Sequence, residues 1–193
     1  MSSQRIPKTV LLAAGLALAA CASARSGIVD SWKAPEAGPL HFNKVLALAV
    51  LDNESLRSRA EDALKANMRG VQSVQGYKIF TVAELENLAG LKERLRKDGF
   101  DGVVVLSLAG AEQKVGWTTD DDPLAEEYAW YPTEHMAVDT IVRVEIKIFS
   151  LTEDKLIWGG ISQNFNPKDT EDLVAKIVAA AGQELRRQGL ISA

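Results

Sequence analysis

The side chains that most often carry nucleophilic or acid–base chemistry are scarce in this sequence. It contains two histidines, His41 and His135, and a single cysteine, Cys21. A nucleophilic site needs a serine, threonine or cysteine beside a base that a third group holds in place. No spacing in the chain joins either histidine to such a set, and paired carboxylates for acid–base catalysis are equally unsupported. The sequence therefore predicts no catalytic residues.

One acidic segment could in principle bind a divalent cation. The carboxylate and imidazole groups that could act as ligands are those of Asp120, Asp121, Asp122, Glu126, Glu127 and His135. The segment lacks the spaced ligands and the central glycine of an EF-hand loop, so a solvated acidic loop explains it better. We predict no metal site and no cofactor.

A pair of glycines, Gly159-Gly160, is the other candidate for a ligand site. A phosphate-binding loop needs glycines between a strand and a helix, and this pair lacks that context. Beside Trp158, the two glycines predict a bulge or a close approach of the backbone.

Cys21 follows a segment that has the parts of an export signal. Arg5 and Lys8 precede an apolar run over residues 9–18, and small residues follow it. The run is shorter than the roughly 20 apolar residues of a membrane-spanning helix. Leu18-Ala19-Ala20-Cys21 resembles the bacterial lipobox, in which the cysteine thiol is acylated and the chain is cut immediately before it.

Acylation of Cys21 would fix the mature protein to a membrane. Two or three acyl chains, such as palmitate, hold a protein stably, because each buried methylene contributes about 0.8 kcal/mol. Where lipoprotein sorting uses an aspartate after the cysteine to retain proteins in the inner membrane, Ala22 implies passage to the outer membrane, facing the periplasm. The alternative interpretation is an ordinary secretory signal that is cut near Ala20 or Ala24.

The segment from Trp117 to His135 is the strongest candidate for a binding surface. It contains six acidic residues and no lysine or arginine, together with four aromatic residues, Trp117, Tyr128, Trp130 and Tyr131. Aromatic side chains supply large contact areas of the kind enriched at binding hot spots. They serve equally well to cover an exposed sheet, and the sequence leaves both roles open.

Strands and helices alternate in the first half of the chain. Val45–Val50 is apolar throughout, as in a strand buried on both faces. The next helix, capped by Asp52 or Asn53 and ended by Gly70, has its apolar stripe at Leu56, Ala60, Leu64 and Met68. Residues 77–80 predict a second strand. The capping box at residues 81–84 predicts the start of a second helix, which has leucines at positions 85, 88, 91 and 95. Residues 102–108 predict a third strand.

The second half predicts a hairpin and a closing helix. Residues 142–148 alternate between apolar and charged side chains, and residues 156–165 form the expected antiparallel partner. Asp169 or Thr170 caps a helix that ends at Gly189. The order predicts an α/β fold with a mixed sheet of about five strands, βαβαβ followed by a ββ hairpin and a C-terminal helix.

Length and charge limit the classes of protein that remain. The 193 residues suffice for one domain. We assign residues 1–20 to a lipoprotein signal peptide, 21–43 to a lipid-anchored tether on which Ser31-Trp32-Lys33 docks against the domain, and 44–193 to a single α/β domain.

Removal of residues 1–20 leaves 20 basic and 26 acidic residues, a net charge of -6. Nucleic acid is therefore not expected as a partner, and lipid rather than charge would attach the protein to the membrane.

Several segments resemble a family of uncharacterised bacterial envelope lipoproteins. The resemblance rests on residues 31–33, 44–50, 60–64, 99–105, 156–160 and 188–191 and spans nearly all of the mature chain. The order of strands and helices is similar to that of the curli-secretion lipoprotein, the amino-terminal domain of the Tol translocation protein and the lipoprotein activators of peptidoglycan synthases. The resemblance implies a location and an architecture but no activity.

Two functions of different classes follow as expectations. The first is a non-enzymatic outer-membrane lipoprotein that binds a protein partner of the cell envelope through the Trp117 to His135 segment. The second is a module that binds a small molecule, a glycan or a cation in the same segment. An enzyme is the third and least supported class.

Overall fold

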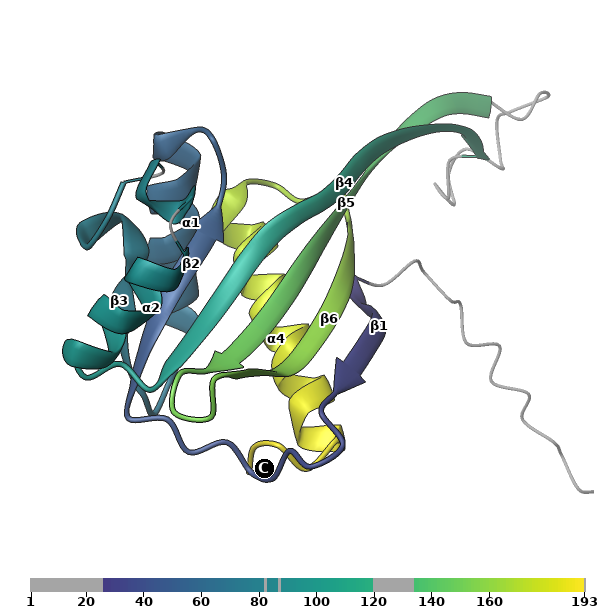
Figure 1. The fold of residues 1–193 in the computed structure, drawn as a ribbon. Helices are drawn as coiled ribbons and strands as arrows, with labels where there is room; N and C mark the ends of the chain where they lie inside the picture. The colour runs from purple at the N-terminus through teal and green to yellow at the C-terminus, as the bar shows by residue number, and fades with distance from the viewer. Residues whose placement is uncertain (1–25, 82, 87, 120–133, 193) are drawn as a thin grey trace, which may run out of the picture.

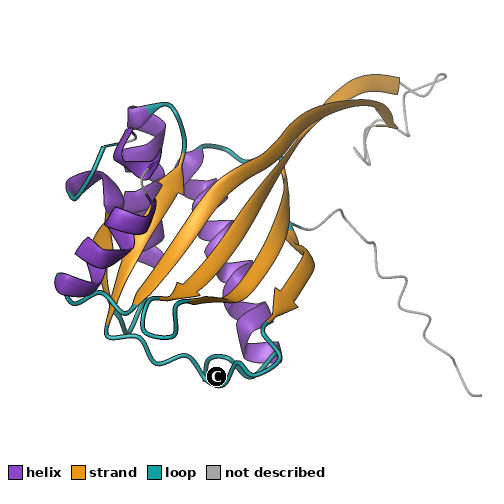
Figure 2. Cartoon of the chain, in the orientation of Figure 1, coloured by secondary structure: helices purple, strands orange, loops and turns teal. Residues whose placement is uncertain are grey.

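A single mixed sheet organises the molecule, and helices cover parts of both of its faces (Figures 1 and 2). The computed structural model describes residues 26–81, 83–86, 88–119 and 134–192. The six strands lie in the order β1-β6-β5-β4-β2-β3. Their bounds are β1 Gly27–Lys33, β2 Lys44–Val50, β3 Gln72–Gln75, β4 Gly102–Thr119, β5 Glu134–Ser150 and β6 Lys155–Phe165. The predicted α/β class and mixed sheet are confirmed, with one strand more than expected.

Alternation along β2 explains the layers. Ala47 and Ala49 pack in one core with helices α1 (Glu54–Asn67) and α4 (Thr170–Arg187). Leu46 and Leu48 point to the other face and pack in a second core with helix α2 (Leu88–Lys97). The parallel neighbours β3 and β4 flank β2, and its apolar run is buried on both faces as predicted except at Val50, which is exposed.

The predicted N-caps of α1 and α4 are confirmed, whereas α1 ends at Asn67, before Gly70, and Leu56 of its predicted apolar stripe is exposed. The side chain of Asn53 accepts a hydrogen bond from the backbone N–H of Leu56 at 3.0 Å, and that of Asp169 accepts one from Asp172 at 2.7 Å. Gly189, after α4, has a φ of 72°, which only glycine adopts without strain. No helix in the described part of the chain is both long and apolar enough to cross a membrane.

The predicted strand over residues 77–80 is wrong. The strand lies earlier, at β3, and Gly76–Lys78 forms a 3-10 helix. A Cβ on Gly76 would lie 3.2 Å from both Glu61 Oε1 and Leu48 Cδ1, so the chain passes the core closely there and turns. The predicted capping box forms, with the N–H of Thr81 donating to Glu84 Oε2 at 2.8 Å, but it opens a 3-10 helix at Ala83–Glu86 rather than α2 itself.

The segment expected to be a tether contributes the sixth strand. β1 pairs antiparallel with β6, and Trp32 lies opposite Gly159. Ser31-Trp32-Lys33 thus joins the domain as an edge strand, with the Trp32 side chain 50% exposed. The chain continues along the domain, where the N–H of Leu40 donates to the carbonyl of Leu190 at 2.7 Å.

Trp158 occupies the centre of the core beneath α4, as the hairpin prediction required. Its side chain is fully buried, and its Nε1 donates a hydrogen bond to Gln188 Oε1 at 3.1 Å. A Cβ on Gly160 would lie 2.4 Å from Trp158 Cη2, so the close approach predicted for the glycine pair is confirmed at Gly160. Only glycine leaves room there for the indole ring.

Candidate interaction surface

The end of the β4–β5 hairpin projects beyond the rest of the sheet (Figure 1). β2 pairs with β4 only as far as Ser107, and β6 pairs with β5 only from Ile141 onward. Residues 113–119 and 134–140 therefore pair with each other and with no further strand of the described chain. We call this two-stranded ribbon the arm.

Two valines form an exposed apolar pair on the arm. Val115 and Val138 lie directly opposite each other, and their side chains are 65% and 52% exposed. Directly opposite residues on an antiparallel pair lie on the same face of the ribbon, so the two side chains form one surface. Both outer edges of the arm also present backbone N–H and C=O groups, which are competent to pair with another strand.

Polar contacts fix the base of the arm. Arg143 Nη2 lies 2.8 Å from Glu112 Oε1 across the two strands. Asn166, directly after β6, donates its backbone N–H to the carbonyl of Thr140 and accepts the N–H of Thr140 on its side-chain oxygen, both at 2.8 Å. The Asn166 amide also donates to Asp139 at 2.8 Å. These bonds continue the ladder where β6 ends, and they hold the arm in a defined direction.

The structure locates part of the predicted binding surface. Trp117 lies in β4 and pairs with Met136, and His135 lies in β5 opposite Thr118. The segment predicted as one long connection is thus strand at both ends, since β4 and β5 are longer than their apolar patterns indicated. Tyr128, Trp130 and Tyr131 lie outside the described residues.

The remaining predicted residues are not brought together in the described structure. Cys21 lies outside it, as do the five acidic residues between positions 120 and 127. His41 lies in the segment between β1 and β2, far in sequence and topology from the arm. Among the described residues, no three His, Cys, Asp or Glu side chains are placed to hold a metal ion.

A buried ion pair lies between α1 and β2 and was not anticipated. Arg57 and Glu61 on α1 are 2% and 0% exposed, and Arg57 Nε lies 2.9 Å from Glu61 Oε1. Glu61 also accepts the backbone N–H of Ala49 at 3.1 Å and that of Tyr77 at 2.6 Å, while Arg57 Nη2 donates to the carbonyl of Phe80. The pair joins α1 to β2 and to the 3-10 helix, a structural role.

A second polar cluster ties β1 to α4. Glu184 Oε1 accepts hydrogen bonds from Ser31 Oγ at 2.8 Å and from Gln188 Nε2 at 2.6 Å. Arg187 forms two further bonds to the Glu184 carboxylate. Hydrogen bonding from Arg187, with smaller contributions from Ser31 and Gln188, lowers the pKa of Glu184 to about 2. The carboxylate is therefore charged at neutral pH and clamps the edge strand to the closing helix.

Comparison with solved structures identifies similar folds at low sequence identity. No protein-family model matches the chain, and no curated protein matches it. A PelC dodecamer from Paraburkholderia phytofirmans aligns with a TM-score of 0.47 and 8% identity, over 81% of this chain and 95% of that chain.

Two further structures are described as lipoproteins. Lipoprotein GNA1162 from Neisseria meningitidis aligns with a TM-score of 0.38 and 13% identity, over 75% of this chain and 99% of that chain. A minor lipoprotein from Acinetobacter baumannii aligns with a TM-score of 0.22 and 12% identity, over 77% of this chain and 93% of that chain.

Proposed function

We propose that this protein is an outer-membrane lipoprotein, anchored through Cys21 and facing the periplasm, that binds a protein partner of the cell envelope without catalysing a reaction. The contact surface is the arm together with the segment that joins its strands. It includes the four aromatic residues that the sequence singles out, Trp117, Tyr128, Trp130 and Tyr131.

The exposed Val115–Val138 pair is the observation that carries this proposal. Val115 and Val138 expose apolar surface to water on a ribbon with two open edges. Burial of that surface against a partner would contribute about 25 cal/mol per Å² to the free energy of binding. A partner strand added to either edge would satisfy the backbone groups, and a partner surface packed on the face of the ribbon would cover the valines. The polar contacts at the base of the arm would limit the ordering cost of such binding.

The anchor predicts a specific processing defect. Cys21→Ser removes the thiol that would carry the lipid, so the precursor is expected to remain unprocessed by the lipoprotein pathway. The wild-type protein is expected to partition into the detergent phase, because its acyl chains prefer an apolar phase. Electrophoretic mobility and Triton X-114 partitioning measure the two effects.

The control for the anchor is Ser23→Ala, two residues after the cysteine. This variant keeps the thiol, so it should mature and partition as the wild type does. Normal maturation of Cys21→Ser would contradict the lipobox.

The aromatic segment predicts a loss of binding without a loss of stability. Trp130→Ala combined with Tyr131→Ala is expected to abolish partner capture and to change the free energy of unfolding by no more than about 0.5 kcal/mol, as surface substitutions usually do. Crosslinking and affinity capture from intact envelopes, with a melting curve, measure both. Trp32→Ala, at a half-exposed tryptophan on β1, is the matched control and should keep capture intact. A stability loss of several kcal/mol would show that the aromatic residues cover the sheet instead.

A further inference from the structure

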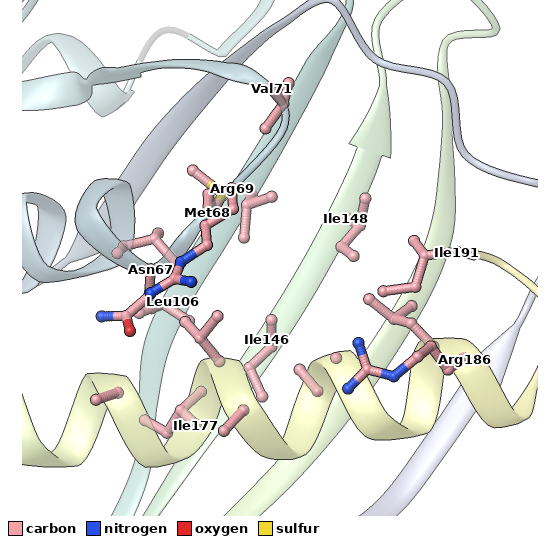
Figure 3. A pocket seen from close by; sticks show the side chains of 18 residues that line it. Asn67, Met68, Arg69, Val71, Leu106, Ile146, Ile148, Ile177, Arg186 and Ile191 are labelled. Atoms are coloured by element: carbon pink, nitrogen blue, oxygen red, sulfur yellow. The ribbon is translucent and has the colours of Figure 1, made fainter. Parts of the chain in front are cut away.

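An apolar groove lies between α1 and α4, on the face of the sheet opposite α2 (Figure 3). Leu106, Ile146 and Ile148 of β4 and β5 form its floor. The groove has a volume of about 470 Å³, within the range of roughly 300–1,000 Å³ that is usual for small-molecule sites. A second hollow of about 340 Å³ shares Met68, Arg69 and other lining residues with it, so the apolar surface extends toward the segment before β2.

The charges at the groove are of one sign. Arg69, after α1, and Arg186, near the end of α4, reach in from opposite sides (Figure 3), and no acidic residue lines either hollow. Within the described chain, the guanidinium of neither arginine has a hydrogen-bond or ion-pair partner. The arginines paired with a carboxylate elsewhere are Arg57, Arg94, Arg96, Arg143 and Arg187. Two cations without a countercharge thus lie beside an apolar groove in a chain whose net charge is -4, an arrangement that favours an anionic ligand.

A glycine on α4 leaves space beside one of these cations. A Cβ on Gly182 would meet only the guanidinium of Arg186, at 3.8 Å, and no other atom within 4 Å. Glycine in a helix interior is less favourable than alanine by about 1 kcal/mol. Gly182 lines the groove, so a large side chain at this position would occupy part of its volume.

We propose that this groove binds a long-chain fatty acid, with the acyl chain along the apolar floor and the carboxylate at one side of the groove, paired with Arg69 or Arg186. Guanidinium groups bind carboxylates through paired, charge-assisted hydrogen bonds. The groove volume suits one acyl chain better than the two chains of a phospholipid. This site is separate from the arm, and the inference does not depend on the proposed protein contact.

The test is titration of the full chain carrying Cys21→Ser, which lacks the acyl anchor, with palmitate and with hexadecanol. Palmitate is expected to bind one to one. Gly182→Leu, which places a side chain in the groove, should weaken palmitate binding at least about tenfold without lowering the melting temperature. Arg69→Gln combined with Arg186→Gln should weaken palmitate binding at least about tenfold, since it removes charged hydrogen bonds, and leave hexadecanol binding unchanged. Arg59→Gln, at an exposed arginine on α1, is the matched control.

Three results would overturn the proposal. One is the absence of palmitate binding to the parent chain. Another is undiminished palmitate binding in the double arginine variant, which remains informative even if Gly182→Leu fails to fold. The third is a change from dimer to monomer on Gly182→Leu in sedimentation, because the groove would then hold a second copy of the chain.

Discussion

Trp158→Ala is expected to lower the free energy of unfolding by about 3–5 kcal/mol, the usual cost of truncating a buried tryptophan. The indole is fully buried between β6 and α4, and the close approach at Gly160 leaves the surrounding backbone little freedom to collapse into the cavity. The substitution also leaves the Gln188 side-chain oxygen without its indole donor. Because domains are stable by only about 5–15 kcal/mol, the variant should be close to unfolding at physiological temperature.

Urea denaturation followed by circular dichroism measures this loss. Trp32→Ala is the matched control, since Trp32 lies on the neighbouring strand β1 with half of its side chain exposed. The control should retain most of the wild-type stability. A Trp158→Ala variant with the wild-type midpoint would contradict both the burial of the ring and the register of the β5–β6 hairpin.

Glu61→Gln is expected to cost about 3–5 kcal/mol, because it leaves the buried guanidinium of Arg57 without a countercharge. Glutamine keeps the shape of the side chain and can still accept a backbone N–H, so the loss reports mainly on charge. Adding Arg57→Met to the Glu61→Gln variant removes the guanidinium that has lost its countercharge. The double variant should therefore be more stable than the sum of the two single losses indicates.

A double-mutant cycle by urea denaturation tests this coupling. The exposed pair Glu93 and Lys97, also four residues apart on a helix and 3.7 Å from each other, provides the matched control cycle. Exposed pairs contribute at most about 1 kcal/mol, so the control cycle should show little coupling. Additive losses at Arg57 and Glu61 would mean that the pair does not act as a unit.

The parts of the fold with a local pattern could be predicted from the sequence. The apolar run of β2, the N-caps of α1 and α4, and the alternation of β5 were each visible over a few residues. Gly160 was also predictable, because glycine beside a tryptophan on a strand indicates a close approach. Side-chain periodicity and capping residues determine these elements, and both can be read from one sequence.

The rest depends on contacts between distant residues. β1 has no apolar alternation, because an edge strand is held by backbone bonds to β6 and not by a buried face. The arm was missed for the same reason: residues 113–119 show no strand pattern, and only pairing with β5 extends them. Arg57 and Glu61 have the spacing of an ordinary exposed helix pair, and their burial arises from the packing of β2 and the turn at Gly76.

The candidate site was predictable only in outline. The aromatic residues of the predicted surface lie in sequence at the end of β4 or between β4 and β5, and the sequence placed Trp117 near one end of the connection. The exposed valine pair could not be predicted, since Val115 and Val138 are neighbours only through the β4–β5 register. Arg69 and Arg186 likewise meet at one groove because α1 and α4 cover the same face of the sheet.

Site-specific photocrosslinking in intact cells tests the central claim most directly. A photoreactive amino acid at position 115 or 138 of the arm is compared with one at position 29, where Val29 on β1 is 58% exposed. We expect positions 115 and 138 to yield the same discrete crosslinked protein, position 29 to yield none of it, and the Trp130→Ala and Tyr131→Ala changes to abolish it. No discrete product from the arm, or the same product from position 29, would contradict a contact surface on the arm.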